Sequence, residues 1–306
     1  MKEIVQFRKQ WVQNRRDFQA RYTLGILTTL TKDIFQSRYH AELLTGVFRR
    51  AGALGHEIKI FTPAKSSYES LDSILHKHSL DGLLILTWRW ISPDIVKFLE
   101  TTIHPRVLVI NDPVPGLEVN LLYSDVDSGI ARALNFLIGK GFRKIGMLHG
   151  PLKIPFVQQG KKVMMPFIDT ELKEKAFIRA LRAKKIPVRR SWIRSAKANA
   201  ESEGYLVAKK WLKEKNLPEA ILCGNDELAF GALRALKSAC KKMAVIGFDD
   251  NEQAKRFTPS LTTIRQPLRQ MGKDAVDVLV QQIRNPFSKT VQKRYPLKLI
   301  IRKSAL

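Results

Sequence analysis

Cysteine is scarce in this sequence, and no apolar stretch is long enough to cross a bilayer. The two cysteines, Cys223 and Cys240, cannot build a disulfide framework, and Cys223 ends a predicted buried strand, where a cysteine acts as a small core hydrophobe. No run approaches the ~18–20 apolar residues of a membrane-spanning helix. Residues 1–18 are interrupted by charge and lack the apolar stretch of a signal peptide. These absences exclude a disulfide-stapled domain and predict a cytoplasmic protein without a membrane partner.

Motifs that carry enzyme chemistry are also missing. Neither a G-x-G-x-x-G after the first predicted strand nor a G-x-x-x-x-G-K-[ST] phosphate loop occurs, and there is no G-x-S-x-G nucleophile elbow. The six histidines are scattered, and His76 and His78 diverge on a predicted helix, so they cannot share a metal ion. We therefore expect no enzymatic activity, no metal and no cofactor.

Acidic residues are few relative to basic ones. There are 28 Asp and Glu against 53 Lys and Arg, which gives a net charge of +25 and a pI near 10.2. Such a surface attracts polyanions, nucleic acid above all, although a generally basic source proteome would explain it equally well. The excess is densest between Lys161 and Lys215.

The stretch from Ala220 to Gly272 organises the rest of the chain. Residues 220–223 and 243–246 are apolar throughout and predict buried parallel strands, with a helix of apolar residues at helical spacing between them. Polar pairs follow the two strands, Asn225-Asp226 after the first and Asp249-Asp250 after the second. Ligands bind beyond the carboxyl ends of strands in open α/β sheets, so these pairs mark a candidate site.

Strands and helices alternate along the whole chain from residue 22, as expected for an α/β fold in two lobes at this length. The stretch 152–170 is long for a loop at its place and predicts an ordered or folding-over insertion. The remaining segments predict strands at 22–30, 57–63, 81–87 and 106–112 and near 145–149, 192–195 and 295–304, and helices at 40–56, 68–78, 92–101, 130–140, 171–183, 200–214 and 271–284.

Five motifs follow one another in the second half of the chain: Asn-Asp at the end of a strand, the helix 230–236, V-I-G-F-D-D at 245–250, P-S-L-T-T-x-R-Q-P at 259–267 and Met-Gly at 271–272. In this order they resemble the effector-binding core of LacI/GalR-type transcription regulators. The resemblance covers residues 23–306. It implies two Rossmann-like lobes with parallel sheets, joined by three crossovers, as in type I periplasmic binding proteins. The implied lobes are 23–122 plus 265–294 and 123–264 plus 295–306.

Residues 1–22 form a basic lead with interspersed aromatic residues. Regulators of the resembled family carry a three-helix DNA-binding headpiece here, which 22 residues cannot hold. We expect the headpiece to be absent, through loss, a fragment or a mis-started reading frame. The lead is expected to be a packing or linker helix, the alternative being a basic arm that touches phosphates without reading bases.

Four polar residues are the main candidates for ligand contact. By the family pattern, Asp249 accepts hydrogen bonds from ligand hydroxyls, while Asn225 can both donate and accept; the alternative for Asp249, and the favoured role for Asp250, is loop or helix capping. Asn111 ends a strand of the first lobe and is expected to face the same cleft. Lys173 stands where the family has an Arg, so it could contact the ligand with a weaker grip or be a solvated helix charge.

Three further candidates lie in the first lobe. Tyr39 could stack on a sugar ring, and His40 could donate a hydrogen bond, although a lone histidine is more often structural. Trp88, after the third predicted strand, could line the cleft or pack on the surface of the lobe.

The resemblance implies a ligand-responsive transcriptional regulator that binds a small polar effector, a sugar above all, and forms a homodimer. DNA is the family's partner, and its reading is in doubt without the headpiece. The alternatives are a stand-alone sugar- or solute-binding protein and a degenerate regulator that no longer reads DNA directly.

Overall fold

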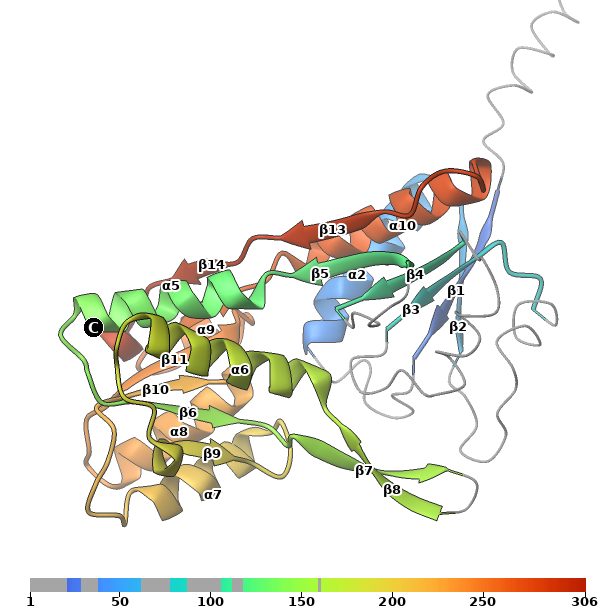
Figure 1. Cartoon of the computed structure of the whole chain (residues 1–306). Coiled ribbons are helices and arrows are strands. Elements are labelled where there is room, and N and C mark those ends of the chain that lie inside the picture. The colour runs from blue at the N-terminus through green and yellow to red at the C-terminus, as the bar shows by residue number, and fades with distance from the viewer. Residues whose placement is uncertain (1–20, 29–37, 62–77, 87–105, 112–117, 159–160) are drawn as a thin grey trace, which may run out of the picture.

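Two six-stranded sheets form the framework of the molecule (Figure 1). The computed structural model describes residues 21–28, 38–61, 78–86, 106–111, 118–158 and 161–306. All pairings in the first sheet are parallel, in the order β13-β5-β4-β3-β1-β2. Its strands are β1 (Thr23–Leu27), β2 (Glu57–Phe61), β3 (Gly82–Ile85), β4 (Val107–Ile110), β5 (Asn120–Ser124) and β13 (Gln292–Tyr295).

The second sheet has the order β14-β12-β11-β10-β6-β9 and is parallel except for β14, which runs antiparallel to β12. The predicted α/β class with two parallel-dominated sheets is confirmed. The strands of this sheet are β6 (Ile145–His149), β9 (Ile193–Ser195), β10 (Ala220–Cys223), β11 (Ala244–Asp249), β12 (Thr262–Arg265) and β14 (Lys298–Ile300).

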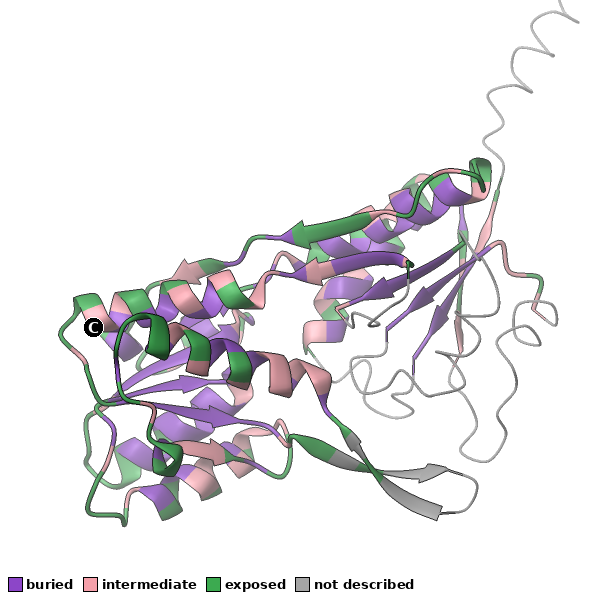
Figure 2. Cartoon of the chain, in the orientation of Figure 1, coloured by how far each residue is buried: buried purple, intermediate pink, exposed green. Residues whose placement is uncertain are grey.

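Helices cover both faces of the second sheet. The helices α5 (Val126–Gly139) and α6 (Ile168–Ala183) pack on one face, and α7 (Glu201–Trp211) and α8 (Asp226–Ser238) pack on the other. Strand β10 contributes Ala220 and Leu222 to the first core and Ile221 and Cys223 to the second. This sharing explains why its sequence is apolar throughout rather than alternating, and Figure 2 shows the strands buried between the helix layers.

In the first lobe, α2 (Arg38–Ala53) and α10 (Leu268–Arg284) pack side by side against the sheet. Their backbones approach closely at Gly46 and Gly272. A β-carbon on Gly46 would collide with the backbone of Arg269, and one on Gly272 with the carbonyl oxygen of Leu43. Glycine at both positions therefore permits the close contact between the two helices.

The chain passes between the two sheets three times: from β5 into α5, from β12 into α10, and from β13 into β14. Two strands differ from the sequence prediction. β5 and β13 had not been predicted as strands, and they pair with each other in parallel along the crossover side of the first sheet. The predicted insertion is a β-hairpin, β7 (Lys153–Gln158) and β8 (Lys161–Pro166), which projects away from the second lobe (Figure 1).

Two predicted helices, at 68–78 and 92–101, and most of the basic lead lie outside the described residues. Within the described ranges, no helix combines the length and apolarity that crossing a membrane requires.

Candidate ligand-binding cleft

A cleft of about 560 Å³ lies at the carboxyl ends of strands from both sheets. Asn111 directly follows β4, and Gly150 directly follows β6. Asn225 lies two residues beyond β10, and Asp249 is the last residue of β11. This is where open α/β sheets bind ligands. The residues that line the cleft are Arg38, Tyr39, Asn111, His149, Gly150, Asp169, Thr170, Lys173, Ala198, Asn199, Ala200, Glu201, Gly224, Asn225, Asp226, Glu227, Asp249, Asn251 and Gln266.

Asp249 lies in the cleft wall with a backbone φ of 112°, a conformation that residues other than glycine rarely adopt. Its Oδ1 accepts a hydrogen bond of 2.7 Å from Nε2 of Gln266. Burial raises the pKa of the carboxyl group to about 7, and the positive charge of Lys173 opposes this increase. The group is therefore a carboxyl held in a poorly hydrated position, ready to accept hydrogen bonds from ligand hydroxyls.

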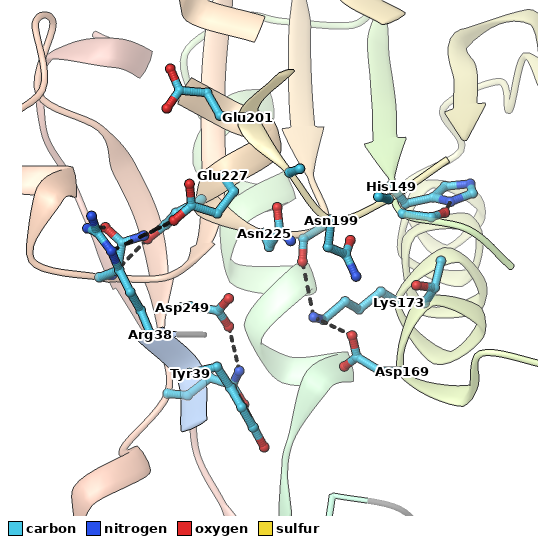
Figure 3. A pocket seen from close by; sticks show the side chains of 18 of the residues that line it. Arg38, Tyr39, His149, Asp169, Lys173, Asn199, Glu201, Asn225, Glu227 and Asp249 are labelled. Carbon is cyan, nitrogen blue, oxygen red and sulfur yellow. Dashed lines mark hydrogen bonds and ion pairs between the residues drawn. The ribbon is translucent and has the colours of Figure 1, made fainter. Parts of the chain in front are cut away.

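Lys173 is a buried ammonium rather than a solvated helix charge, with the residue 4% exposed. Its Nζ donates to Oδ2 of Asp169 at 2.8 Å and to the carbonyl oxygen of Gly224 at 3.0 Å. The same nitrogen lies 4.1 Å from the ring centroid of Phe248. The two hydrogen bonds, drawn in Figure 3, hold the charge at the cleft wall.

Asn225 has a structural role in addition to its place in the cleft. It is the N-cap of α8, and its Oδ1 accepts from the backbone N–H of Leu228 at 2.8 Å. Its neighbour Asp226 is completely buried, accepting from Oγ1 of Thr263 at 2.5 Å and from the backbone N–H of Asn251 at 2.8 Å. Burial raises the pKa of Asp226 well above its ordinary value, with the charge of Asp249 adding to the effect. Asp226 thus ties the start of α8 to the loop after β11.

The first lobe supplies Tyr39 and Asn111 to the cleft. Asn111 has a φ of 61°; its Nδ2 donates to the hydroxyl of Tyr39, and its Oδ1 accepts from the backbone N–H of Ser124 at 2.8 Å. His40 is fully buried, contacts the Tyr39 ring edge-on at 5.1 Å, and is not among the residues lining the cleft. Trp88 lies outside the described residues. The structure thus brings together five of the seven predicted residues.

A chain of hydrogen bonds crosses from one lobe to the other behind these side chains. Asp249 accepts a hydrogen bond from Gln266, whose Oε1 accepts a hydrogen bond of 2.5 Å from the hydroxyl group of Ser124. Ser124 in turn donates its N–H to Asn111, which donates to Tyr39. Gln266 and Ser124 lie at two of the three passages between the lobes. Asp249 and Tyr39 are therefore linked through the hinge.

Arg38 forms a second bridge, at the side of the cleft. From the first turn of α2 its guanidinium donates to Oε1 of Gln253 at 2.8 Å and to Oδ1 of Asn251 at 3.3 Å, and it lies 3.9 Å from Glu227. Sequence reasoning did not single out Arg38, although it directly precedes Tyr39. Its partners lie more than 180 positions away, so only the folded chain reveals the bridge.

Other residues of the cleft were also missed. Asp169 lies four residues before Lys173 on one helix, a spacing that could have predicted the pair. His149 ends β6, is buried, and contacts the Gly150 carbonyl oxygen through Nδ1 at 2.7 Å. Burial lowers its pKa, so the imidazole is neutral near pH 7. Asn199, Glu201 and Glu227 complete the polar wall (Figure 3).

Asp250 does not have the capping role that the sequence favoured. Its side chain is 3% exposed and accepts from Nε of Arg265 at 2.5 Å and from Nη2 of Arg302 at 2.6 Å. These bonds join the loop after β11 to β12 and to the C-terminal segment. The arginines lie 15 and 52 positions from Asp250, beyond the few residues that a capping pattern covers.

The cleft is acidic although the protein as a whole is basic. Five carboxyl groups line it, from Asp169, Glu201, Asp226, Glu227 and Asp249, against the two cations Arg38 and Lys173. Carboxylates and amides suit a ligand rich in hydroxyl groups.

The described residues contain no cluster of three or more His, Cys, Asp or Glu arranged to hold a metal ion.

Comparison with known proteins assigns the family. The profile of the periplasmic binding protein-like domain matches residues 134–305, more than half of the chain. The chain belongs to this family. The match spans the second sheet, α10 and two of the three passages between the sheets.

Curated relatives of this periplasmic binding protein-like chain are repressors. It is 28% identical to the ribose operon repressor of Haemophilus influenzae over 271 residues, covering 86% of this chain and 75% of that protein. It is 27% identical to the HTH-type transcriptional repressor PurR of Shigella sonnei over 270 residues, covering 86% and 74%. These relatives confirm the predicted resemblance to LacI-type regulators.

Solved structures of LacI-type proteins share its fold. A LacI family transcriptional regulator from Enterococcus faecium with bound ribose superposes with a TM-score of 0.74 at 21% identity, covering 92% of this chain and 98% of that one. The lac repressor dimer bound to operator and an anti-inducer gives a TM-score of 0.76 at 22% identity, covering 96% and 98%. The periplasmic binding protein-like fold therefore extends over nearly the whole chain.

Proposed function

We propose that this chain is the effector-binding core of a LacI-type transcriptional regulator, and that a small polar ligand with the hydroxyl pattern of a sugar binds in the cleft. Tyr39, Asn111, Lys173, Asn225 and Asp249 contact the ligand. Asp249 and Asn225 form hydrogen bonds with its hydroxyl groups, and the ring of Tyr39 packs on its C–H face.

The observation that carries this proposal is the composition of the cleft. A space of about 560 Å³ matches the range of small-molecule sites, and its wall combines residues from both lobes. Relatives named for the ribose operon and a ribose-bound structural neighbour support a sugar as the ligand class.

A ligand that touches both lobes stabilises their closed arrangement relative to an open one. It shifts the equilibrium between the two states only through its difference in affinity for them. The hinge chain of Asp249, Gln266, Ser124 and Asn111 transmits this difference, because it bonds ligand-contacting residues to two of the connections between the lobes.

The regulator acts as a homodimer in the cytoplasm and alters transcription through DNA. Dimeric and operator-bound lac repressor neighbours support this assembly. Coupling between ligand and DNA is a free energy shared by the two sites, so a ligand that changes DNA affinity must itself bind differently in the presence of DNA.

Thermal unfolding with D-ribose, other pentoses and hexoses tests the cleft. At least one sugar is expected to raise the Tm of the wild-type protein, as binding to the folded state requires. Asp249→Ala should remove this increase while the protein remains folded. The control is Asp127→Ala, since Asp127 is 64% exposed and pairs with Arg179 on the helix surface; it should keep the full increase. An undiminished increase in Asp249→Ala would refute the site.

A further inference from the structure

The second sheet has a strongly basic end, opposite to the cleft. Four loops precede β6, β9, β10 and β11: residues 139–144, 184–192, 212–219 and 239–243. Together they contain eleven Lys and Arg and two Glu, a net charge of +9. We call these four loops the basic end face.

The topology explains why the loops gather at one end. Parallel strands connected by helices all begin at the same edge of the sheet, where the preceding helices end. α5, α6, α7 and α8 accordingly finish beside these loops, at the left of the second lobe in Figure 1. The cleft lies at the carboxyl ends of the same strands, about 15–20 Å away for strands of this length. A partner at the basic end face would thus leave the cleft free.

The cations of this face are exposed and largely unneutralised. All eleven are classed as exposed, and Figure 2 shows this end of the lobe as mostly exposed surface. Glu214 accepts from Arg194, outside the four loops, at 2.5 Å. Glu219 accepts from the backbone N–H groups of Arg143 and Lys144 within the face, and one of the eleven cations, Arg190, pairs with Glu174 at 2.8 Å. One lysine in each loop has a side-chain ammonium group that forms no ion pair with a carboxylate of the described part of the chain: Lys144, Lys184, Lys213 and Lys241.

Stabilisation of helix ends accounts for only a small part of this charge. Each helix C-terminus carries roughly half a negative charge, so four of them offset about two of the nine positive charges. The remaining positive charge, about seven, is several-fold larger than the helix ends require. A general excess of lysine over the surface would not produce the same concentration at one edge of one sheet.

We propose that the basic end face binds the phosphate backbone of duplex nucleic acid without reading its sequence. The four loops precede neighbouring strands, and at about 4.8 Å between strands they span roughly 15 Å, enough to reach phosphates on both sides of a groove about 12 Å wide. Flexible lysines contact phosphates and gain affinity by releasing counterions.

A membrane surface fits this face less well. Interfacial binding needs exposed apolar side chains beside the basic ones. Among the described residues, the large exposed apolar side chains are Phe48, Leu152, Met164, Leu206, Phe287, Ile301 and Leu306. None lies in the four loops, and Leu306 alone is tied close to them, through the bond of Ser304 to the Val245 carbonyl oxygen at the start of β11.

Fluorescence anisotropy with a labelled 20-base-pair duplex of arbitrary sequence tests the proposal on the whole chain. The affinity is measured at several NaCl concentrations between about 50 and 300 mM. The wild-type protein should bind, and log K should fall linearly with log [NaCl]. The end-face variant removes one lysine from each loop: Lys144→Gln, Lys184→Gln, Lys213→Gln and Lys241→Gln.

Each lost phosphate contact lowers the salt slope by about 0.9. The end-face variant should therefore show a slope reduced by about 2 to 4, and an affinity at least tenfold lower at about 100 mM NaCl. The control variant carries the same net charge, with four exposed lysines removed elsewhere, and should change the slope by less than about 1: Lys59→Gln, Lys273→Gln, Lys289→Gln and Lys298→Gln.

Equal losses in the two variants would mean that only total charge matters and would overturn the proposal, as would failure of the wild-type protein to bind the duplex at the lowest salt. Binding of phosphatidylserine vesicles that depends on the four end-face lysines, without duplex binding, would assign the face to membranes instead. The sugar-induced increase in Tm should be unchanged in the end-face variant, so this test and that of the cleft can fail separately.

Discussion

Replacement of Asp249 by asparagine is expected to stabilise the unliganded protein at alkaline pH while abolishing ligand binding. The asparagine keeps an oxygen that can accept from Gln266, and it removes a charge that burial disfavours. Functional sites often hold such unfavourable groups because the ligand needs them.

The direction of this change in stability follows from the raised pKa of Asp249. The folded protein holds the Asp249 proton up to about pH 7, whereas the unfolded chain releases it near pH 3.9. The stability that this proton provides is fully present below the unfolded pKa and is lost as the pH rises towards and through 7. At about 1.4 kcal/mol per pH unit, the loss between pH 5 and 7 reaches about 3 kcal/mol, and solvent in the cleft reduces it to about 1–3 kcal/mol.

Urea unfolding of the wild-type protein and Asp249→Asn at about pH 5 and pH 8 measures this difference. The variant should gain about 1–3 kcal/mol relative to the wild type between the two pH values. Asp226 titrates in both proteins, and the charge of Asp249 contributes to its raised pKa, so the difference reports Asp249 together with its coupling to Asp226. Asp127→Asn, at an exposed carboxylate, is the control for the loss of one negative charge. If the stability difference between Asp249→Asn and the wild type is the same at both pH values, the raised pKa is wrong.

Two further predictions concern stability alone. Lys173→Met leaves the carbonyl oxygen of Gly224 without its buried donor and Asp169 without its partner, and should lower the free energy of unfolding in urea by about 1–3 kcal/mol. The control Lys175→Met, at an exposed pair, should lower it by under about 0.5 kcal/mol. Equal losses in the two variants would contradict the role of Lys173. Cys240 has a φ of 51° just beyond the end of α8, a conformation that costs about 1–2 kcal/mol for residues other than glycine, so Cys240→Gly should raise the free energy of unfolding by about 1 kcal/mol, and a decrease would count against this reasoning.

The strands of the second lobe show what local pattern can predict. Residues 220–223 and 243–246 are apolar throughout because they are covered on both faces, so they were recognisable from the sequence. β13 reads Gln-Lys-Arg-Tyr and is mostly exposed. No periodicity marks it as a strand, and it is one only because its backbone pairs with β5. β5 has only the short apolar run Leu121-Leu122 between polar residues, too little pattern to indicate a strand, and it is one because it pairs with β4 and β13.

The candidate site divides in the same way. Asn111, Asn225 and Asp249 follow apolar strands, and the rule that parallel strands end at one edge places them together. The burial of Lys173 depends on Gly224, 51 positions away. The bridge from Arg38 depends on Gln253, 215 positions away. Such contacts have no trace in local pattern.

The sequence alone therefore determined the class of fold, most of its strands and helices, and the strand ends that line the cleft, because these depend on periodicity and on neighbours in the chain. Only the tertiary structure decided which charges are buried, which side chains bond across the hinge, and that the basic loops share one edge of a sheet. Those properties arise from segments far apart in sequence that fold into contact, and the free energy of each charge depends on what surrounds it.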